Sequence, residues 1–208
     1  MDVEKGAASF MSPRNIERDI QQREIRINHI LDSALEIIAV KGIGSVNIND
    51  IAAAAGMGIG SLYHYFKSKN EIISEILRRG QTDYRRHVTH IAEQECNALD
   101  KLHLLCDSWL ALDNSWAYTI LIHTARLSDA SSEEIRKAVT DRFTNNLGPV
   151  AEIMGQGQRD GLVVKGEPLE LAYYFVSLIQ GLTLQKMPGT EVPIRAQASS
   201  IIALFTAR

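Results

Sequence analysis

The stretch NINDIAAAAGMGIGSLYHYFKSK, at residues 47–69, decides the fold of this chain. Its pattern predicts two short helices, one from about Ile48 to Ala55 and one from about Ile59 to Phe66, joined by a glycine-containing turn. Gly56 permits the reversal of the chain between them, because glycine takes the left-handed conformation without a steric penalty. Two short helices joined in this way form a helix-turn-helix, whose second helix can enter the major groove of DNA.

The apolar residues of this stretch fall on one face of each expected helix. Ile51, Ala52 and Ala55 give the first helix a small apolar face, and small residues let two helices cross closely. Leu62 and Phe66 lie four residues apart, so they can anchor the second helix on the core. The residues left on the exposed faces of the second helix are Ile59, Gly60, Ser61, Tyr63 and His64.

The sequence on either side of this motif predicts longer helices. Apolar residues recur with the period of a half-buried helix from about Arg23 to Lys41, and Gly42 supplies a stop. Ser68 and Glu71 form a capping-box pattern, which opens a long helix from about Lys69 into the mid-nineties.

The rest of the chain also has helical periodicity. It marks the segments near 99–113, 116–128, 132–160, 168–186 and 193–207. Gly148-Pro149 is expected to kink or split the segment 132–160, because proline removes a helix hydrogen bond. Strand-like alternation is lacking, so we predict an all-α fold. The expected organisation is a flexible leader at 1–22, a three-helix DNA-binding domain with the helix-turn-helix at 23–70, and a helical ligand-binding and dimerisation domain at 71–208.

The composition is that of an ordinary soluble protein, with 45% hydrophobic and 23% charged residues among 208. A net charge of -3 argues against a surface coated with nucleic-acid contacts, yet it allows one small DNA-binding surface. No apolar run approaches the ~20 residues of a membrane helix, and the N-terminus has no apolar signal core. The two cysteines are too few for a disulfide framework. We therefore expect a cytoplasmic protein.

The sequence shows no signature of catalysis. It contains no Walker loop, no dinucleotide-binding fingerprint and no set of nucleophile, base and orienting group. We therefore expect neither an enzyme nor a bound cofactor.

The helix-turn-helix stretch resembles the DNA-binding domain of the TetR family of transcriptional regulators. Many matches at fixed spacing carry the resemblance, over the segments 30–34, 50–52, 55–57 and 60–69 together with Gly42. The resemblance implies a dimeric regulator, commonly a repressor, that holds operator DNA with its N-terminal domain. It also implies a C-terminal helical domain that binds a small ligand and forms the dimer.

The resemblance implies roles for individual residues. Gly60 lies at the position that allows the recognition helix of family members to approach DNA closely. Tyr63 lies at the position where a tyrosine hydroxyl of family members contacts a phosphate. Lys67 and Lys69 occupy basic positions beside the phosphate backbone. Asn47, at a helix N-terminus where the family commonly has threonine, can hold a phosphate with its side chain and nearby N–H groups.

Base-edge contacts are expected from the exposed face of the second helix. Ser61, Ile59 and His64 are the best candidates, since serine can donate or accept and isoleucine can touch a thymine methyl. Asn49, another expected DNA-binding residue, replaces a common arginine, and Gly58 replaces a common serine. Each change removes a charge or a hydroxyl near DNA, so we expect binding to depend more on shape and dimerisation.

Large aromatic side chains gather in the C-terminal part of the chain. Ligand pockets are mostly apolar, with a few polar groups that orient the ligand. We predict that Trp109, Trp116 and His123 line the pocket that the resemblance implies.

The last two predicted helices are expected to form the dimer interface as a four-helix bundle. The residues predicted to lie in it are Leu178, Gly181, Leu182, Ile201 and Phe205. A two-fold dimer binds a pseudo-palindromic operator. Ligand would favour a conformer whose two recognition helices are wrongly spaced for DNA. The long helix from Lys69 links the two domains, so a change in its tilt would transmit the effect of the ligand.

A metal-responsive regulator is one alternative. His87 and His90, and likewise His103 and Cys106, are spaced to share a helix face, and Cys96 lies between the pairs. Imidazole and thiolate suit zinc or copper. Because such pairs arise often by chance, we expect no metal.

A second alternative is a ligand-independent architectural DNA-binding factor of the same fold. It would use a basic stripe near the start of the long helix, made of Arg78, Arg79, Arg85 and Arg86. Such a factor would lack an open pocket.

Overall fold

The computed structural model describes the backbone of residues 13–129 and 131–208, and the side chains of all of these except 13–15 and 141–146. Within these ranges the chain forms nine helices, and its β pairing is limited to an isolated bridge between Val163 and Thr206. The predicted all-α fold is thereby confirmed. The helices are α1 (Pro13–Lys41), α2 (Ile48–Ala54), α3 (Ile59–Tyr63), α4 (Lys69–Ala92), α5 (Ala98–Ala111), α6 (Ser115–Leu127), α7 (Glu133–Arg159), α8 (Pro168–Leu184) and α9 (Ala198–Ile202).

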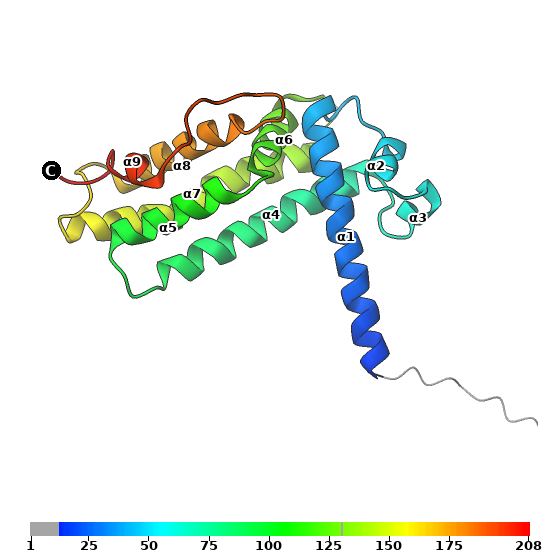
Figure 1. Ribbon diagram of the computed structural model, residues 1–208, viewed down its shortest axis with the longest axis horizontal. Coiled ribbons are helices and arrows are strands. Elements are labelled where there is room, and N and C mark those ends of the chain that lie inside the picture. Colours follow the sequence, from blue (N-terminus) through cyan, green and yellow to red (C-terminus); the bar gives the residue numbers. More distant parts are fainter. Residues whose placement is uncertain (1–12, 130) are drawn as a thin grey trace, which may run out of the picture.

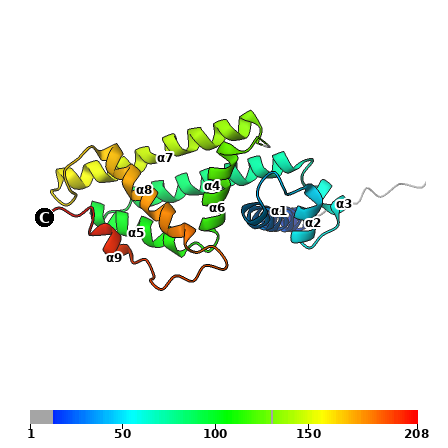
Figure 2. The same cartoon turned by 90° about the horizontal axis from the view of Figure 1, so that it is seen from above.

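The helices form a small unit and a larger helical body. The helices α2 and α3 lie with α1 at one end of the molecule, and α5, α8 and α9 lie towards the other (Figures 1 and 2). The long helix α4 begins beside α3 and runs through the larger body, where it packs on α5 and α7. The helix α1 packs on α2, α4 and α6, so it contacts both parts of the molecule.

Two clusters of buried apolar side chains hold these helices together. The first cluster joins Ile30 of α1 with Leu62 of α3, Ile73 of α4 and Leu121 of α6. The second lies among the distal half of α4 and α5, α7, α8 and α9, and its largest fully buried side chain is Phe175. Burial of apolar area is the main stabilising contribution to such a fold. Because the first cluster includes α6, one continuous core spans both of the domains predicted from the sequence.

The helix-turn-helix forms where the sequence predicts it, because its signals are local. The Asn47 side chain accepts hydrogen bonds from the backbone N–H groups of Asn49 (2.8 Å) and Asp50 (3.1 Å). The Asp50 carboxylate accepts from the Asn47 N–H in return (2.9 Å), which completes a capping box. Gly42 and Gly56 have φ values of +86° and +63°, the left-handed region that glycine occupies at little cost.

The structure corrects the predicted start of the first helix. The helix α1 begins at Pro13 rather than near Arg23, so the leader predicted over 1–22 is wrong for residues 13–22, while residues 1–12 lie outside the described residues. Proline suits the first helical position because its fixed φ is already helical and its missing N–H has no partner there. No glycine or further proline follows before Gly42, so nothing in the sequence interrupts this helix.

The helix α7 runs on through Pro149, so the segment 132–160 is not split there, and the kink that was the other expectation stays a prediction. The last helix is much shorter than the predicted 193–207. It ends early because the backbone after it pairs with the segment following α7, through Val164 N–H to Phe205 O (2.9 Å) and Ala207 N–H to Leu162 O (2.8 Å).

None of the helices in the described part of the chain combines the length and the apolar character that a membrane span requires.

The close approach of α7 to α5 depends on Gly157. A Cβ atom at this position would lie 2.8 Å from the Ala98 Cβ and closer still to a methyl group of Val163. The Ala98 Cβ cannot rotate away, so we expect Gly157→Ala to lower the free energy of unfolding by about 1–3 kcal/mol through overpacking. Gly155 lies in the same helix, and a Cβ atom there would meet its nearest neighbours at ordinary contact distances of 3.6 Å or more, so Gly155→Ala should instead raise stability by up to about 1 kcal/mol. Urea unfolding of both variants tests the contrast, and equal effects would contradict it.

Candidate DNA-binding surface and ligand cavity

The helix α3 presents one anchored face and one exposed face. Leu62 is fully buried and Phe66 is 5% exposed, whereas Ile59 and Tyr63 are 38% and 50% exposed. Gly60, Ser61 and His64 are exposed as well. A Cβ atom at Gly60 would meet no other heavy atom within 4 Å, so no internal contact explains the glycine. The exposed face of α3 is therefore available to a partner that approaches the backbone closely.

The residues before α2 are partly committed to their own helix. The side-chain oxygen of Asn47 accepts the hydrogen bonds of the capping box, so the side-chain NH₂ group is left for an outside partner. Asn49 is exposed on the first turn of α2. Both residues lie at the positions that the sequence predicts for DNA contact.

Lys69 has a structural role that was not predicted from the sequence. Its ammonium group donates hydrogen bonds to the carbonyl oxygens of Ile43 and Val46, both at 2.8 Å. It thereby fastens the loop between α1 and α2 to the start of α4. These bonds use two of its three N–H donors, so the predicted contact of Lys69 with a phosphate stays a prediction. Lys67 remains exposed, so it keeps the predicted position.

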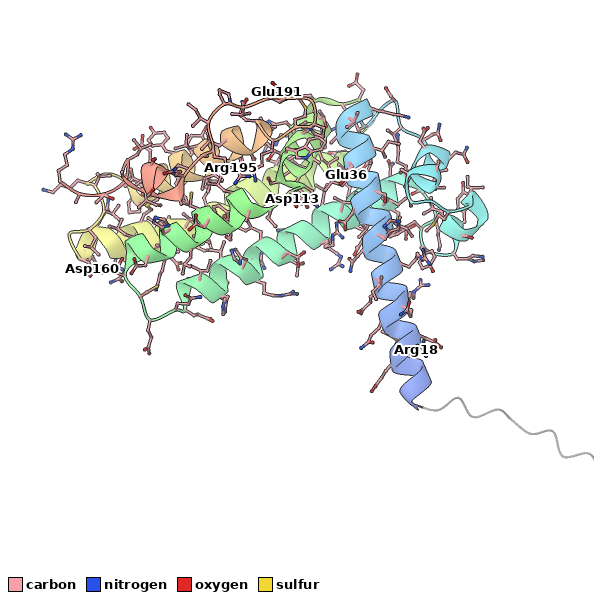
Figure 3. All side chains as sticks on the ribbon, viewed as in Figure 1. Arg18, Glu36, Asp113, Asp160, Glu191 and Arg195 are labelled. Atoms are coloured by element: carbon pink, nitrogen blue, oxygen red, sulfur yellow. The ribbon has the colours of Figure 1, made fainter. Side chains whose placement is uncertain are left out.

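An arginine that was not predicted from the sequence lies beside the recognition helix. The Arg23 guanidinium lies 5.0 Å from the centroid of the Tyr65 ring, a cation–π distance. This contact attaches the outer part of α1 to the loop that follows α3. Beyond it, α1 projects away from the rest of the molecule, with Arg18 extending from the projecting part (Figure 3). Nothing in the spacing of the sequence predicts that Arg23 and Tyr65 meet.

A cavity of about 710 Å³ lies between the two parts of the molecule. Five helices line it, namely α1, α4, α5, α6 and α8. Its aromatic and aliphatic lining consists of Leu35, Tyr84, Trp109, Leu112, Tyr118, Ile122, Val176 and Ile179. Its polar lining consists of Asn28, Asp32, Arg79, Asp83, His87, Ser108, Asn114, Ser115, Thr119, Gln180 and Thr183. An apolar wall with convergent polar groups is the usual make-up of a small-molecule site.

One of the three predicted pocket residues lines this cavity. Trp109 stacks on Tyr84, with ring centroids 5.3 Å apart and an interplanar angle of 15°. Trp116 is instead buried in the first core, and His123 is exposed outside the cavity. Trp116 and His123 each follow a lining residue of α6, Ser115 and Ile122, by one position, which is about 100° around the helix. Neither of them lines this cavity, and their predicted contact with a ligand stays a prediction.

His87 is a neutral polar group in the cavity wall. Its Nε2 lies 2.6 Å from the Ser108 hydroxyl oxygen, and that hydroxyl donates to the Leu105 carbonyl at 2.8 Å. A serine hydroxyl has one hydrogen, so His87 must donate from Nε2. Burial lowers the pKa of His87, and the neighbouring His90 lowers it further. The imidazole is therefore uncharged at neutral pH.

The structure divides the predicted dimer residues into two groups. Ile201 and Phe205 are each 5% exposed and belong to the second core of the same chain, where Phe205 packs edge-on against Phe175 at 5.5 Å. They are therefore not available to a partner, which corrects that prediction. Leu178 and Leu182 are half-buried, and Gly181 is exposed with open space around it.

The exposed face of α8 carries apolar residues that were not predicted from the sequence to lie at an interface. Leu169, Tyr173 and Tyr174 are 48%, 44% and 50% exposed. Leu169 and Tyr173 are four residues apart, and Gly181 follows two turns later, so the three share a face. Their spacing was visible in the sequence, but the inner face of α8 could not be distinguished from the outer one.

The residues of the metal alternative do not come together. Within the described part of the chain, no three His, Cys, Asp or Glu side chains form a group that could hold a metal ion. His87 bonds Ser108, and His103 lies 3.2 Å from the Asp107 carboxylate. Burial, aided by Asp107, raises the pKa of Cys106 to about 11. A protonated, buried thiol is a poor metal ligand.

The basic stripe of the architectural alternative is discontinuous. Arg78 bonds Glu75 within α4 at 2.5 Å, and Arg86 lies 3.7 Å from Asp83. Arg79 points the other way and reaches Asp32 of α1 at 2.6 Å. The stripe is therefore largely paired with acidic neighbours.

An exposed recognition helix, together with a lined cavity in the adjoining helical body, defines a DNA-binding transcriptional regulator rather than an enzyme. Residues 30–76 match the family described as bacterial regulatory proteins, tetR family. This part of the chain is therefore a DNA-binding domain of the TetR family.

The similarity to known regulators extends along most of the chain. It is 23% identical over 191 residues to the fatty acid metabolism regulator protein of Bacillus subtilis, covering 89% of this chain and 96% of that protein. It is 27% identical over 163 residues to the transcriptional repressor KstR2 of Mycobacterium tuberculosis, covering 77% of this chain and 80% of that protein.

Two solved structures share the fold. The ketosteroid transcriptional regulator KstR2 of Mycobacterium tuberculosis superposes with a TM-score of 0.72 at 22% identity, covering 88% of this chain and 96% of that one. FadR of Bacillus subtilis, solved in complex with stearoyl-CoA, superposes with a TM-score of 0.64 at 23% identity, covering 85% of this chain and 95% of that one. These likenesses concern the helical architecture of both parts of the molecule.

The two lysines near the start of α4 should behave differently when replaced. We expect Lys67→Ala to weaken DNA binding and to reduce the slope of log affinity against log salt by about one, because one phosphate contact is lost. We expect Lys69→Ala to lower the free energy of unfolding by about 1–3 kcal/mol, because two carbonyls lose their partner. DNA affinity at several salt concentrations and urea unfolding measure the two effects. The opposite pattern, with Lys67 governing stability and Lys69 the salt dependence, would contradict these roles.

Proposed function

We propose that this protein is a homodimeric repressor that binds a pseudo-palindromic operator and is released when a small, partly apolar molecule enters the cavity. One observation carries the proposal: the cavity and the DNA-binding unit share α1. Asn28, Asp32 and Leu35 line the cavity, while Ile30 of the same helix belongs to the core that supports α3. A ligand in the cavity would therefore contact the DNA-binding unit directly.

The DNA side of the proposal rests on the exposed faces of α2 and α3. The residues proposed to contact DNA are Asn47, Asn49, Ile59, Gly60, Ser61, Tyr63, His64 and Lys67. Tyr63 and Lys67 would hold phosphates and set the register of the helix, whereas Ser61, Ile59 and His64 would contact base edges. The capping box at Asn47 supports this role, because it holds the N-terminus of α2 rigid beside the recognition helix.

The dimer side rests on the exposed apolar face of α8. Leu169, Tyr173 and Gly181 lie on it with half-buried Leu178 and Leu182 beside them. A second copy related by a two-fold axis would bury the same face on both subunits. Such a dimer presents two copies of α3, which is the arrangement that a pseudo-palindrome requires.

The ligand side rests on the size and lining of the cavity. A volume of about 710 Å³ suits a small molecule, and the stacked Tyr84 and Trp109 offer a broad apolar surface. Polar groups such as His87 and Gln180 could orient one end of the ligand. The FadR relative binds stearoyl-CoA and the KstR2 relative is a ketosteroid regulator, which supports a ligand with a large apolar part.

Selection of binding sites from a random duplex library, at fixed salt, tests the proposal. We expect a pseudo-palindrome to be enriched. Tyr63→Phe should weaken binding to it by about 0.5–1.5 kcal/mol per subunit, the contribution of one hydrogen bond. Ser199→Ala is the control, because it removes a hydroxyl from an exposed residue of α9, away from α2 and α3.

Enrichment of no sequence would defeat the proposal. Unchanged affinity of Tyr63→Phe would remove the assigned role of this hydroxyl. An enriched site without two-fold symmetry would defeat the dimer.

A further inference from the structure

The cavity wall contains a charged contact between the two parts of the molecule. Arg79 of α4 reaches across to α1, where its guanidinium bonds the Asp32 carboxylate at 2.6 Å and the Asn28 side-chain oxygen at 3.2 Å. The Arg79 side chain is 21% exposed and the Asp32 side chain 50%. All three residues line the cavity, and Arg79 is the only lysine or arginine in its described lining.

The same part of α4 is held on its other side by α6. The Tyr118 hydroxyl donates to the Ile76 carbonyl at 2.7 Å. A Cβ atom at Gly80 would overlap that hydroxyl oxygen, so the glycine allows the tyrosine to rest on the helix. Tyr118 and Gly80 also line the cavity. The segment 76–80 thus contacts α6 through Tyr118 and α1 through Arg79, and residues of both contacts line the cavity.

The helix α1 carries the DNA-binding unit with it. Ile30 and Leu31, next to Asp32 in the chain, are buried in the core that includes Ile51 of α2 and Leu62 of α3. A well-packed core moves as a body because it cannot deform continuously. The same core also includes Ile73 and Ile76 of α4, so α1 and the start of α4 are packed together. The Arg79–Asp32 pair adds a polar contact between α4 and α1 beside the cavity, and through it an occupant of the cavity can affect how α1 is held against α4.

We propose that the Arg79–Asp32 ion pair positions the DNA-binding unit for operator binding, and that a ligand acts by taking one partner of this pair. This inference rests on the proposed function and identifies the contact that regulates it. A polar group of the ligand that bonds Arg79 or Asp32 competes with the ion pair. Occupation of the cavity therefore weakens the contact between α4 and α1. Ion pairs with this much exposure contribute little to global stability, so the fold persists when the pair is broken.

The chain supplies a matched control one residue earlier. The Arg78–Glu75 pair has a similar distance, 2.5 Å, and lies on the same helix. Its two partners belong to α4, and neither lines the cavity. Breaking it removes an ion pair from α4 without freeing α1.

The test measures operator affinity, with no ligand present, for Arg79→Gln, Asp32→Asn and the control Arg78→Gln. We expect the first two to bind the selected operator at least about 5-fold more weakly, the lower end of typical coupling between sites. We expect Arg78→Gln to keep wild-type affinity. The double variant Asp32→Arg/Arg79→Asp exchanges the charges and should recover affinity, which a merely destabilised fold would not do. Circular dichroism and thermal unfolding of each variant establish that it is folded.

The outcomes separate this inference from the function on which it rests. A wild-type protein that selects no operator overturns both. Wild-type affinity in Arg79→Gln and Asp32→Asn overturns the role of the ion pair alone, and so does tighter binding in either. Equal losses of operator affinity in Arg79→Gln and Arg78→Gln would also overturn it. The loss would then follow from the removal of a positive charge on α4 and not from the broken contact with α1.

Discussion

The packing of α1 is the constraint on which the rest of the structure depends. One side of this helix supports α2 and the recognition helix, and its contacts with α4 and α6 join it to the larger body. Because the buried residues of these helices form one cluster, the recognition helix cannot change its orientation independently of α1. In the proposed function, this shared core connects DNA binding with the state of the helical body.

The cavity lies where this connection can be altered. Its apolar surface, which includes the stacked Trp109 and Tyr84, can hold the body of a ligand, while its polar groups come from all five of the lining helices. A ligand changes an equilibrium between two arrangements only if it binds one of them better. Contacts that form at the α1 wall supply that difference, whereas contacts confined to α5 and α8 would add affinity without changing DNA binding. In this arrangement the position of the ligand, more than its affinity, determines its effect.

Local signals predicted the helix-turn-helix, and tertiary packing decided most of what could not be predicted. Asn47, Gly42 and Gly56 act on their immediate neighbours, so their roles followed from the sequence alone. The burial of Trp116 and Phe205 depends on which helix each one faces. The sequence pattern of an apolar residue is the same whether it lies in a core, a pocket or a dimer interface, so the pattern cannot distinguish these places. Lys69 was assigned to DNA from the family resemblance, whereas its hydrogen bonds to carbonyls 26 and 23 residues earlier in the chain depend on the tertiary fold and could not be predicted.

The most direct test of the central claim is the reciprocal effect of operator on ligand binding. The dissociation constant of a small molecule that stabilises the protein in a thermal-shift screen would be measured for the protein alone and with saturating operator. Thermodynamic linkage requires that operator weaken ligand binding by the same factor by which ligand weakens operator binding, typically about 5- to 150-fold. We predict weaker binding of this ligand to the operator complex by such a factor. Equal dissociation constants with and without operator would contradict the coupling of the cavity to DNA.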